Sequence, residues 1–267
     1  MIEWRCPIFS SLLDGGDVWR TTELLLQIVN GLQMEMTERY LRQTVLPELG
    51  ESGQQKLMNA KVLVVGVGGL GSPASIYLTA AGVGTLGLVD DDVVSISNLQ
   101  RQILYTEEEV GLSKAECATR RLHALNSDVK INTYPFRLTQ DNVADIVAHY
   151  DLVLDGCDNF ATRYLLNDAC LAAGKPYVFG AIKGFEGQVS VFSAGDNPRS
   201  YRMLYPEDSV VQPTDIRDKG VLGTTPAIVG SVAATEAIKL ITGIGEPLIG
   251  KLWTIDLRTM ESAIYDF

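Results

Sequence analysis

The stretch KVLVVGVGGLGSPA, Lys61 to Ala74, joins a continuous apolar run to a cluster of glycines. The apolar run predicts a buried strand, and Ser72 and Pro73 suit the N-cap and first position of a following helix. Between them, the glycines match the G-x-G-x-x-G spacing that lets a backbone turn tightly and approach a phosphate at a helix N-terminus. The matching residues are Gly66, Gly68 and Gly71. This stretch predicts a nucleotide-binding turn but does not identify the nucleotide.

Strand and helix patterns alternate from this turn onward. A second apolar run ends at Asp90, and short apolar runs continue to alternate with helical segments up to about residue 182. This alternation is typical of a parallel sheet with helices on both faces. The predicted elements after Asp90 are a helix over 106–126, a strand over 130–138, a helix from Thr139, a strand over 151–156, a helix from about Ala161 and a strand over 176–182.

The C-terminal third has a different pattern. Residues 187–193 alternate strictly between apolar and polar, and residues 225–243 predict a helix with an apolar face. Residues 251–257 and 262–267 predict a terminal antiparallel pair. We therefore expect an α/β fold, a Rossmann-like, doubly wound, mostly parallel sheet extended by antiparallel strands at its C-terminal end.

Composition and charge limit the function classes. The chain has 267 residues, 46% of them hydrophobic, and a net charge of −11. Such an acidic chain argues against a nucleic-acid surface, and any phosphate chemistry must concentrate its few cations. The four cysteines show no C-x-x-C spacing, and no signal peptide or membrane-spanning apolar run is evident. We expect a cytoplasmic enzyme that binds neither nucleic acid nor membrane.

The polar residues after the second strand favour ATP over a nicotinamide nucleotide. Asp90 lies nineteen positions beyond Gly71, where an acidic residue holds the ribose of either ligand. Asn98, Arg101 and Lys114 follow it. A polyphosphate needs such cations and a nicotinamide ring does not, so the sequence favours ATP.

An ordered series of motifs resembles the ThiF/MoeB/HesA family, the bacterial relatives of ubiquitin-activating enzymes. The resemblance extends from about Thr37 to the C-terminus. Its motifs are ERYLRQTVLPELG, VLVVGVGGLGSPASIYL, SNLQRQILY, VGLSKAE, DGCDNFATRYLLND, FEGQVSVF and GSVAATEAIKLITG. Within the family the chain is most similar to the thiamine-thiazole branch, ThiF, because of RQTVLPELG, NFATRY and a short C-terminus without a rhodanese-like domain.

The resemblance implies an adenylyltransferase. Family members use ATP with Mg²⁺ to adenylate the C-terminal glycine of a small ubiquitin-like sulfur-carrier protein ending in Gly-Gly, so that a sulfur donor can act on it later. They work as homodimers. The molybdopterin-synthase branch, with its small subunit as carrier, is the close alternative. A NAD-binding oxidoreductase and a non-catalytic nucleotide-binding scaffold are the alternatives from other classes.

The resemblance also implies a set of site residues. Gly69 and Asp90 would hold the nucleotide, and Asn98, Arg101 and Lys114 would contact its phosphates. Asp158 would bind magnesium, with Asn159 beside it, and Asp155 is a weaker candidate. Arg42 resembles the arginine that the family inserts into the partner subunit's site. The expected catalytic residues are Arg42, Arg101, Lys114 and Asp158.

The resemblance also implies a division of the chain. Residues 1–35 are expected to be an N-terminal extension of unknown role, with a helical pattern over 21–34. Residues 36–267 would form one domain, with the nucleotide core over about 60–182. The carrier-binding, crossover and dimer part would cover about 183–267.

Cysteine and histidine usage departs from the family or adds little to it. The two C-x-x-C pairs that hold a structural zinc in most members are missing, so no zinc is expected. The crossover segment, about Met203 to Gly223, also lacks the cysteine that can bond the carrier covalently. The remaining cysteines are interpreted as packing residues, and His123 and His149 as partly buried structural residues. The carrier carboxylate is already ionised at neutral pH, so no histidine base is needed.

Overall fold

The computed structural model describes residues 38–209 and 220–267. The predicted extension over 1–35, with its helix at 21–34, lies outside the described residues. The middle of the predicted crossover segment does so too. The proposed division of the chain stays a prediction.

The described residues form one eight-stranded sheet in the order β3-β2-β1-β4-β5-β6-β7-β8. The first five strands are parallel, and the last three are antiparallel to their neighbours. This confirms the predicted α/β fold and the predicted change to antiparallel pairing. The parallel strands are β1 (Lys61–Val65), β2 (Thr85–Val89), β3 (Lys130–Tyr134), β4 (Leu152–Asp155) and β5 (Tyr177–Lys183). The antiparallel strands are β6 (Glu186–Phe192), β7 (Lys251–Asp256) and β8 (Glu261–Asp266).

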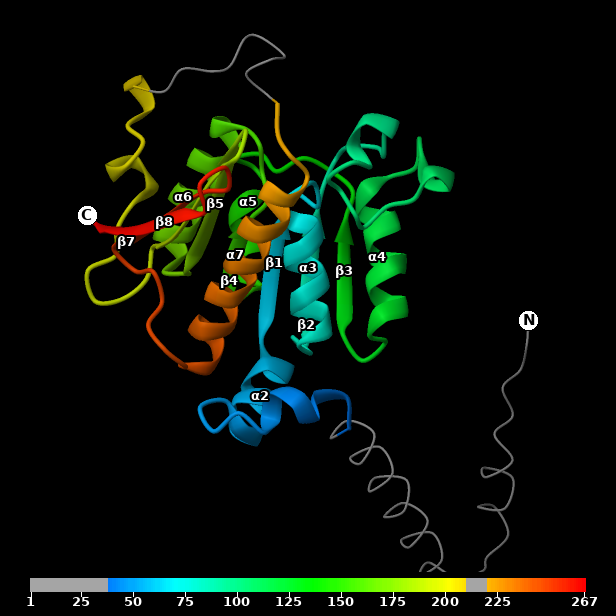
Figure 1. Ribbon diagram of the computed structural model, residues 1–267, viewed down its shortest axis with the longest axis horizontal. Coiled ribbons are helices and arrows are strands. Elements are labelled where there is room, and N and C mark those ends of the chain that lie inside the picture. Colours follow the sequence, from blue (N-terminus) through cyan, green and yellow to red (C-terminus); the bar gives the residue numbers. More distant parts are fainter. Residues whose placement is uncertain (1–37, 210–219) are drawn as a thin grey trace, which may run out of the picture.

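Helices cover both faces of the parallel part of the sheet (Figure 1). Val62 and Val64 of β1 belong to the core cluster on the side of α3, α4 and α7, whereas Leu63 and Val65 belong to the cluster on the side of α5 and α6. A strand buried on both faces has to be continuously apolar, as the sequence of β1 is. The helices are α2 (Gly50–Asn59), α3 (Gly71–Ala80), α4 (Lys114–Leu125), α5 (Val143–Ala148), α6 (Phe160–Ala173) and α7 (Thr224–Thr242), with short 3₁₀ helices η1 (Ile96–Asn98), η2 (Glu107–Glu109), η3 (Tyr201–Met203) and η4 (Glu207–Ser209).

Three predicted helix starts are wrong, and one of them is that of α5, which is predicted from Thr139 but begins only at Val143. Helix α3 begins at Gly71, so Ser72 is not its N-cap but lies inside it, where its hydroxyl donates to the carbonyl of Val67 at 3.2 Å. The helix predicted over 106–126 begins only at Lys114, because Gly111 takes a φ of +91° that ends any preceding helical run. The turn of glycines therefore leads directly into α3, with no separate cap.

The sheet has two functionally different edges. In Figure 1 the turns that follow β1 and β2 lie at its upper, carboxyl edge, and α2 lies below its lower, amino edge. The helical turn over 38–44 packs at the amino edge, where Gln43 donates to the carbonyl of Ala81 at 2.9 Å. Doubly wound sheets bind their ligands at the carboxyl edge, so that edge is where the site is sought. Across residues 38–209 and 220–267, every helix is too short or too polar to span a bilayer.

Candidate active site

Two of the four glycines in the first turn are needed for backbone packing. Gly66 has a φ of +86°, and a Cβ there would lie 2.7 Å from the carbonyl oxygen of Gly156. A Cβ at Gly71 would collide with the carbonyl oxygen of Gly66. These contacts hold the turn after β1 against the start of α3 and against the turn after β4. Gly66 and Gly71 are thus required by close packing, whatever the turn binds.

The other two glycines lie beside polar side chains. A Cβ at Gly68 would meet only the amide of Gln102, at 3.5 Å from Nε2. A Cβ at Gly69 would lie 3.3 Å from Pro226 and 3.7 Å from Cδ of Arg101. The absence of side chains at these two positions keeps the turn open beside an amide and a guanidinium. This is the part of the turn to which a phosphate could come close.

Asp90 lies next to the glycine turn and is oriented by it. Its carboxylate accepts hydrogen bonds from the backbone N–H of Val67 at 2.9 Å and of Asp92 at 3.0 Å. Burial raises the pKa of Asp90, while the nearby Lys114 ammonium and the two backbone N–H groups oppose that shift. A carboxylate held in this way is a fixed acceptor at the end of β2.

Lys114 is a buried cation at the start of α4. Its side chain is 6% exposed, and its Nζ donates to the carboxylate of Asp92 at 2.9 Å. Ser113, the N-cap, accepts from the backbone N–H of Glu116, which fixes where α4 begins. A buried ammonium keeps its charge only with an anionic partner. The ion pair with Asp92 holds Lys114 close enough to Asp90 to act on its pKa. The two residues are far apart in the sequence, so only the fold shows that they are neighbours.

Asn98 and Arg101 come from η1 and the turn after it. The side-chain oxygen of Asn98 accepts from the backbone N–H of Ser95 at 3.3 Å, and its carbonyl accepts from the N–H groups of Arg101 and Gln102. The guanidinium of Arg101 donates to the carbonyl of Ser97 at 3.1 Å. Asn98 thus holds the turn that carries Arg101 beside Gly69.

Gln102 is a candidate that the sequence reasoning missed. It is only 5% exposed, and its Oε1 has no hydrogen-bond partner among the described residues. Leaving a buried amide oxygen without a partner is costly, so the unpaired Oε1 of Gln102 points to a missing donor, while its Nε2 lies on the side of Gly68. The one available signal was its place directly after Arg101 in SNLQRQ. Nothing in that pattern distinguishes a buried glutamine from a solvated one.

Asp158 and Asn159 follow β4 on the turn that packs against Gly66. Asp158 is exposed and makes no hydrogen bond among the described residues. Asn159 is the N-cap of α6 and accepts from the backbone N–H of Thr162 at 2.9 Å. Its predicted role at the nucleotide therefore has to coexist with a capping role.

Asp155, the weaker candidate, is a structural residue. Its carboxylate is fully buried and accepts from Arg163 at 3.2 Å, from the hydroxyl of Tyr177 at 2.8 Å and from the backbone N–H of Cys157 at 2.7 Å. Arg163 also donates to the carbonyls of Cys157 at 2.8 Å and Gly180 at 3.3 Å. Burial lowers the pKa of Arg163, but Asp155, Tyr177, Tyr201 and Cys157 together raise it by more, so the pKa is raised overall. This network fixes the backbone immediately before Asp158.

Arg42 is not brought together with the other predicted residues of its own chain. It lies on the helical turn over 38–44, is exposed, and makes no hydrogen bond or ion pair with a described residue. Its neighbour Gln43 contacts the C-terminal end of α3, whereas the glycine turn precedes the N-terminal end. Ten helical residues span about 15 Å. Arg42 and the glycine turn of the same chain therefore lie at opposite edges of the sheet.

The cysteines and histidines add no chemistry to this edge. Cys117, Cys157 and Cys170 are buried and unpaired, and Cys157 donates to the carbonyl of Val65 at 3.3 Å. Burial raises the pKa of Cys157 well above that of a free thiol, and Asp155 adds to the shift. Both histidines are exposed, so their predicted partial burial is wrong. Residues 38–209 and 220–267 contain no group of three or more His, Cys, Asp or Glu side chains that could hold a metal ion.

Comparison with known sequences identifies the family. The ThiF family profile matches residues 40–266. The chain belongs to the ThiF family. This confirms the resemblance read from the motifs, although the comparisons do not separate the thiamine branch from the others.

Curated relatives of this ThiF-family protein are named as adenylyltransferases. The sulfur carrier protein adenylyltransferase of Thermus thermophilus is 50% identical over 227 residues, which are 83% of this chain and 84% of the relative. The probable adenylyltransferase/sulfurtransferase MoeZ of Mycobacterium tuberculosis is 50% identical over 240 residues, 88% of this chain. The adenylyltransferase and sulfurtransferase MOCS3 of Dictyostelium discoideum is 45% identical over 82% of this chain. This chain spans 61% of the length of MoeZ and 52% of MOCS3.

Solved structures confirm the fold of this ThiF-family protein. The structure of PaaA aligns with a TM-score of 0.74 at 22% sequence identity, and the alignment covers 99% of this chain and 87% of the PaaA chain. The structure of Escherichia coli MccB with MccA-N7isoASN aligns with a TM-score of 0.75 at 23% sequence identity. That alignment covers 86% of this chain and 71% of the MccB chain. At this identity the likeness is one of fold.

Proposed function

We propose that this protein is an adenylyltransferase that uses ATP to activate the C-terminal glycine carboxylate of a small ubiquitin-like sulfur-carrier protein ending in Gly-Gly. The carrying observation is the convergence at one sheet edge of an open glycine turn, a fixed carboxylate at Asp90 and a buried cation at Lys114. The names of the full-length relatives support the same reaction class.

The residues present fit ATP. Gly68 and Gly69 leave the turn open on the side of the Gln102 amide nitrogen, which can donate to a phosphate oxygen, and Asp90 offers carboxylate oxygens for ribose hydroxyls. Arg101 and Lys114 supply positive charge where phosphates would lie. A nicotinamide nucleotide would give these two cations nothing to neutralise, so the geometry favours ATP over NAD.

Asp158 is the residue we assign to magnesium. A single exposed carboxylate suits Mg²⁺, which usually keeps several waters and takes only one or two protein carboxylates together with phosphate oxygens. Bound Mg²⁺ supplies charge neutralisation on the phosphates. Asn159 stays beside it through its capping bond to α6, and the Asp155–Arg163 pair holds the preceding backbone.

The remaining residues position the reactants and need no proton transfer. The carrier carboxylate is already ionised, so the protein must bring it to the α-phosphate and offset the charge that accumulates on the leaving pyrophosphate. Lys114, anchored by Asp92, and Arg101 are the groups for that task. We further propose that the enzyme acts as a homodimer, with Arg42 entering the partner's site, and that a sulfur-donor protein uses its product.

The carrier itself is assigned by motif. RQTVLPELG and NFATRY favour the thiamine-thiazole carrier, and the small subunit of molybdopterin synthase is the second candidate. Nucleotide binding is assigned to residues of about 60–182, and carrier binding and dimer contacts to about 183–267.

Carrier-dependent exchange of pyrophosphate into ATP tests this function. We expect exchange with one of the two carriers and none with the same carrier lacking its last glycine, because the shortened tail withdraws its terminal carboxylate by one residue, about 3.5 Å, from the α-phosphate. NADH should not bind measurably at a concentration at which ATP saturates. Saturable NADH binding without exchange on either carrier would contradict the assignment.

A further inference from the structure

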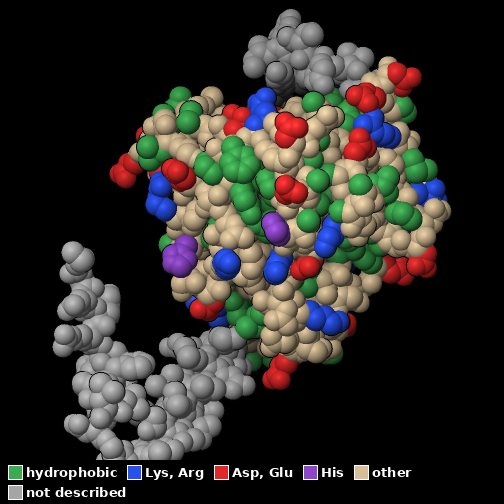
Figure 2. Space-filling view, turned by 180° about the vertical axis from the view of Figure 1, so that it is seen from behind, with side chains coloured by type: hydrophobic (Ala, Val, Ile, Leu, Met, Phe, Trp, Pro, Cys, Tyr) green, Lys and Arg blue, Asp and Glu red, His purple; other side chains and the backbone are tan. Residues whose placement is uncertain are grey.

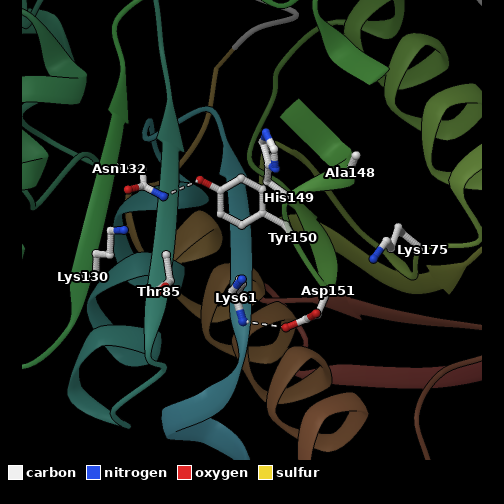
Figure 3. Close-up of a pocket in the computed structure, with 9 residues that line it drawn as sticks. All are labelled: Lys61, Thr85, Lys130, Asn132, Ala148, His149, Tyr150, Asp151 and Lys175. Atoms are coloured by element: carbon white, nitrogen blue, oxygen red, sulfur yellow. Dashed lines mark hydrogen bonds between the residues drawn. The ribbon is translucent and has the colours of Figure 1, made fainter. Parts of the chain in front are cut away.

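A polar cavity lies at the amino edge of the sheet, opposite to the glycine turn. It is a cavity of about 320 Å³, which is within the size range of small-ligand sites. Its lining residues all come from strand starts and the segments before them (Figure 3). They are Lys61, Thr85, Lys130, Asn132, Ala148, His149, Tyr150, Asp151 and Lys175.

The strand register brings two of the lysines into one row. Lys61 is paired with Thr85, and Thr85 with Lys130, across the first residues of β1, β2 and β3. Strands lie about 4.8 Å apart, so the Cα atoms of Lys61 and Lys130 are about 10 Å apart. Figure 3 shows Lys130 and Lys175 on opposite sides of the hollow, with Lys61 between them. Three flexible side chains can therefore converge on one ligand.

These three ammonium groups have no partner among residues 38–209 and 220–267. By contrast, Lys56, Lys114, Lys239 and Lys251 each donate to a protein oxygen. The one carboxylate in the lining, Asp151, already accepts from the backbone N–H of Lys61 at 2.8 Å. Figure 2, which views the molecule from behind, shows Lys or Arg side chains gathered around a histidine in the lower half of that face.

The floor of the cavity is rigid and polar. Tyr150 is buried, and its hydroxyl bonds to Asn132 Nδ2 at 3.1 Å and to the hydroxyl of Tyr134 at 3.0 Å. These hydrogen bonds fix the Tyr150 ring at the base of the cavity, and the lysine side chains extend around it. In a chain of net charge −11, three lysines that face a single carboxylate, Asp151, form a local positive potential that attracts anions.

We propose that this cavity binds a small molecule carrying a di- or triphosphate group. Lys175, just before β5, starts about 10 Å from Lys61 on the other side and about 20 Å from Lys130. Three lysines spread in this way match several linked negative charges, whereas one orthophosphate is too small to engage all of them. Nucleic acids and membranes need an extended basic surface, and this one is confined to a single hollow. The proposal is independent of the adenylylation, because the cavity lies at the other end of the strands.

A purely structural role for the lysines makes the opposite prediction. Cations near helix C-termini stabilise helices, and α5 and α6 end close to this cavity, at Ala148 and Ala173. In that case replacing the lysines would lower the melting temperature in the absence of any ligand. If the site awaits a ligand, the unpaired cations repel one another, and their removal leaves the melting temperature equal or higher.

Thermal unfolding with tripolyphosphate, without magnesium and at constant ionic strength, tests the two roles. The probe should raise the melting temperature of the wild type, and Lys61→Gln/Lys130→Gln should weaken its affinity for the cavity about tenfold or more. Lys183→Gln is the control, because Lys183 is exposed, lies outside the cavity and has no hydrogen-bond partner among the described residues. An unchanged response in the double variant overturns the proposal.

Residue-resolved lysine acetylation, read by mass spectrometry, locates the bound probe. Tripolyphosphate should protect Lys61, Lys130 and Lys175 and leave Lys183 reactive. Unchanged reactivity of the three cavity lysines, at a probe concentration that raises the melting temperature, overturns the proposal and leaves the adenylylation intact. Equal protection by orthophosphate, or protection only by RNA or acidic-lipid vesicles, also overturns it.

Discussion

At the scale of single residues, the four glycines of the first turn have different reasons to be glycine. Gly66 and Gly71 face backbone carbonyls at distances that leave no room for a Cβ. A Cβ at Gly68 would have ordinary spacing, and one at Gly69 would press only on the Pro226 side chain, at 3.3 Å. Packing thus requires two of the four glycines far more than the other two, and we propose that these other two are kept open for a ligand.

We predict that Gly66→Ala and Gly69→Ala separate these roles. Gly66→Ala should lower the free energy of unfolding by about 2 kcal/mol or more, because it combines a left-handed φ with a clash against Gly156. Gly69→Ala should change stability by less than about 1 kcal/mol but weaken ATP binding. Urea unfolding and ATP titration measure the two effects. Equal loss of stability in both variants would contradict this division.

At the scale of elements, one buried ion pair ties three segments together. Arg163 on α6 bridges Asp155 at the end of β4, the carbonyl of Cys157 and the carbonyl of Gly180 in β5. The rings of Phe160 and Phe179 lie 5.7 and 5.4 Å from the guanidinium carbon. The pair therefore fixes the turn that carries Asp158.

We predict that Arg163→Met lowers the free energy of unfolding by about 3 kcal/mol, because it leaves the Asp155 carboxylate buried without its cation. Tyr177→Phe, which removes one hydrogen bond to the same carboxylate, should cost only about 1 kcal/mol. The pair Arg163→Met/Asp155→Asn should recover part of the loss. Denaturant unfolding measures all three, and an additive loss in the double variant would refute the buried-charge explanation.

At the scale of the whole molecule, the position of Arg42 bears on assembly. In one chain it lies at the amino edge, whereas the glycine turn and Asp90 lie at the carboxyl edge. Arg42 can therefore serve a nucleotide site only in another subunit, unlike Arg101, which lies beside Gly69 of its own chain. The proposed homodimer would make each site incomplete without its partner.

We predict that Arg42→Ala and Asp158→Ala each abolish exchange and that a mixture of the two regains activity after subunit exchange. An arginine acting in trans can contribute about a thousandfold in rate, so neither homodimer should work. Half the dimers in an equal random mixture are heterodimers with one intact site, and recovery should approach roughly a quarter of wild-type activity. No recovery, with subunit exchange shown by mass spectrometry, would mean that Arg42 does not act across the dimer.

The order of elements and the type of sheet could be predicted from the sequence alone. Continuous apolar runs such as 62–65 require burial on both faces. The alternation predicted over 187–193 falls on the antiparallel strand β6, although residues 189–192 of that strand are all buried. The glycine spacing and Asp90 also follow from local pattern, because the chain brings them to one edge by the simple rule that parallel strands end together. These features depend on neighbouring residues or on short-range periodicity.

Contacts between distant segments were decided only by the tertiary structure. The burial of Gln102, the pairing of Asp155 with Arg163 and the convergence of Lys61, Lys130 and Lys175 depend on strands and helices that meet only after folding. A sequence pattern cannot separate a buried glutamine or lysine from a solvated one, because each residue type occurs in both environments. The packing of the whole sheet sets the surroundings of each polar side chain. Those surroundings determine whether the side chain binds a ligand, caps a helix or supports a neighbouring segment.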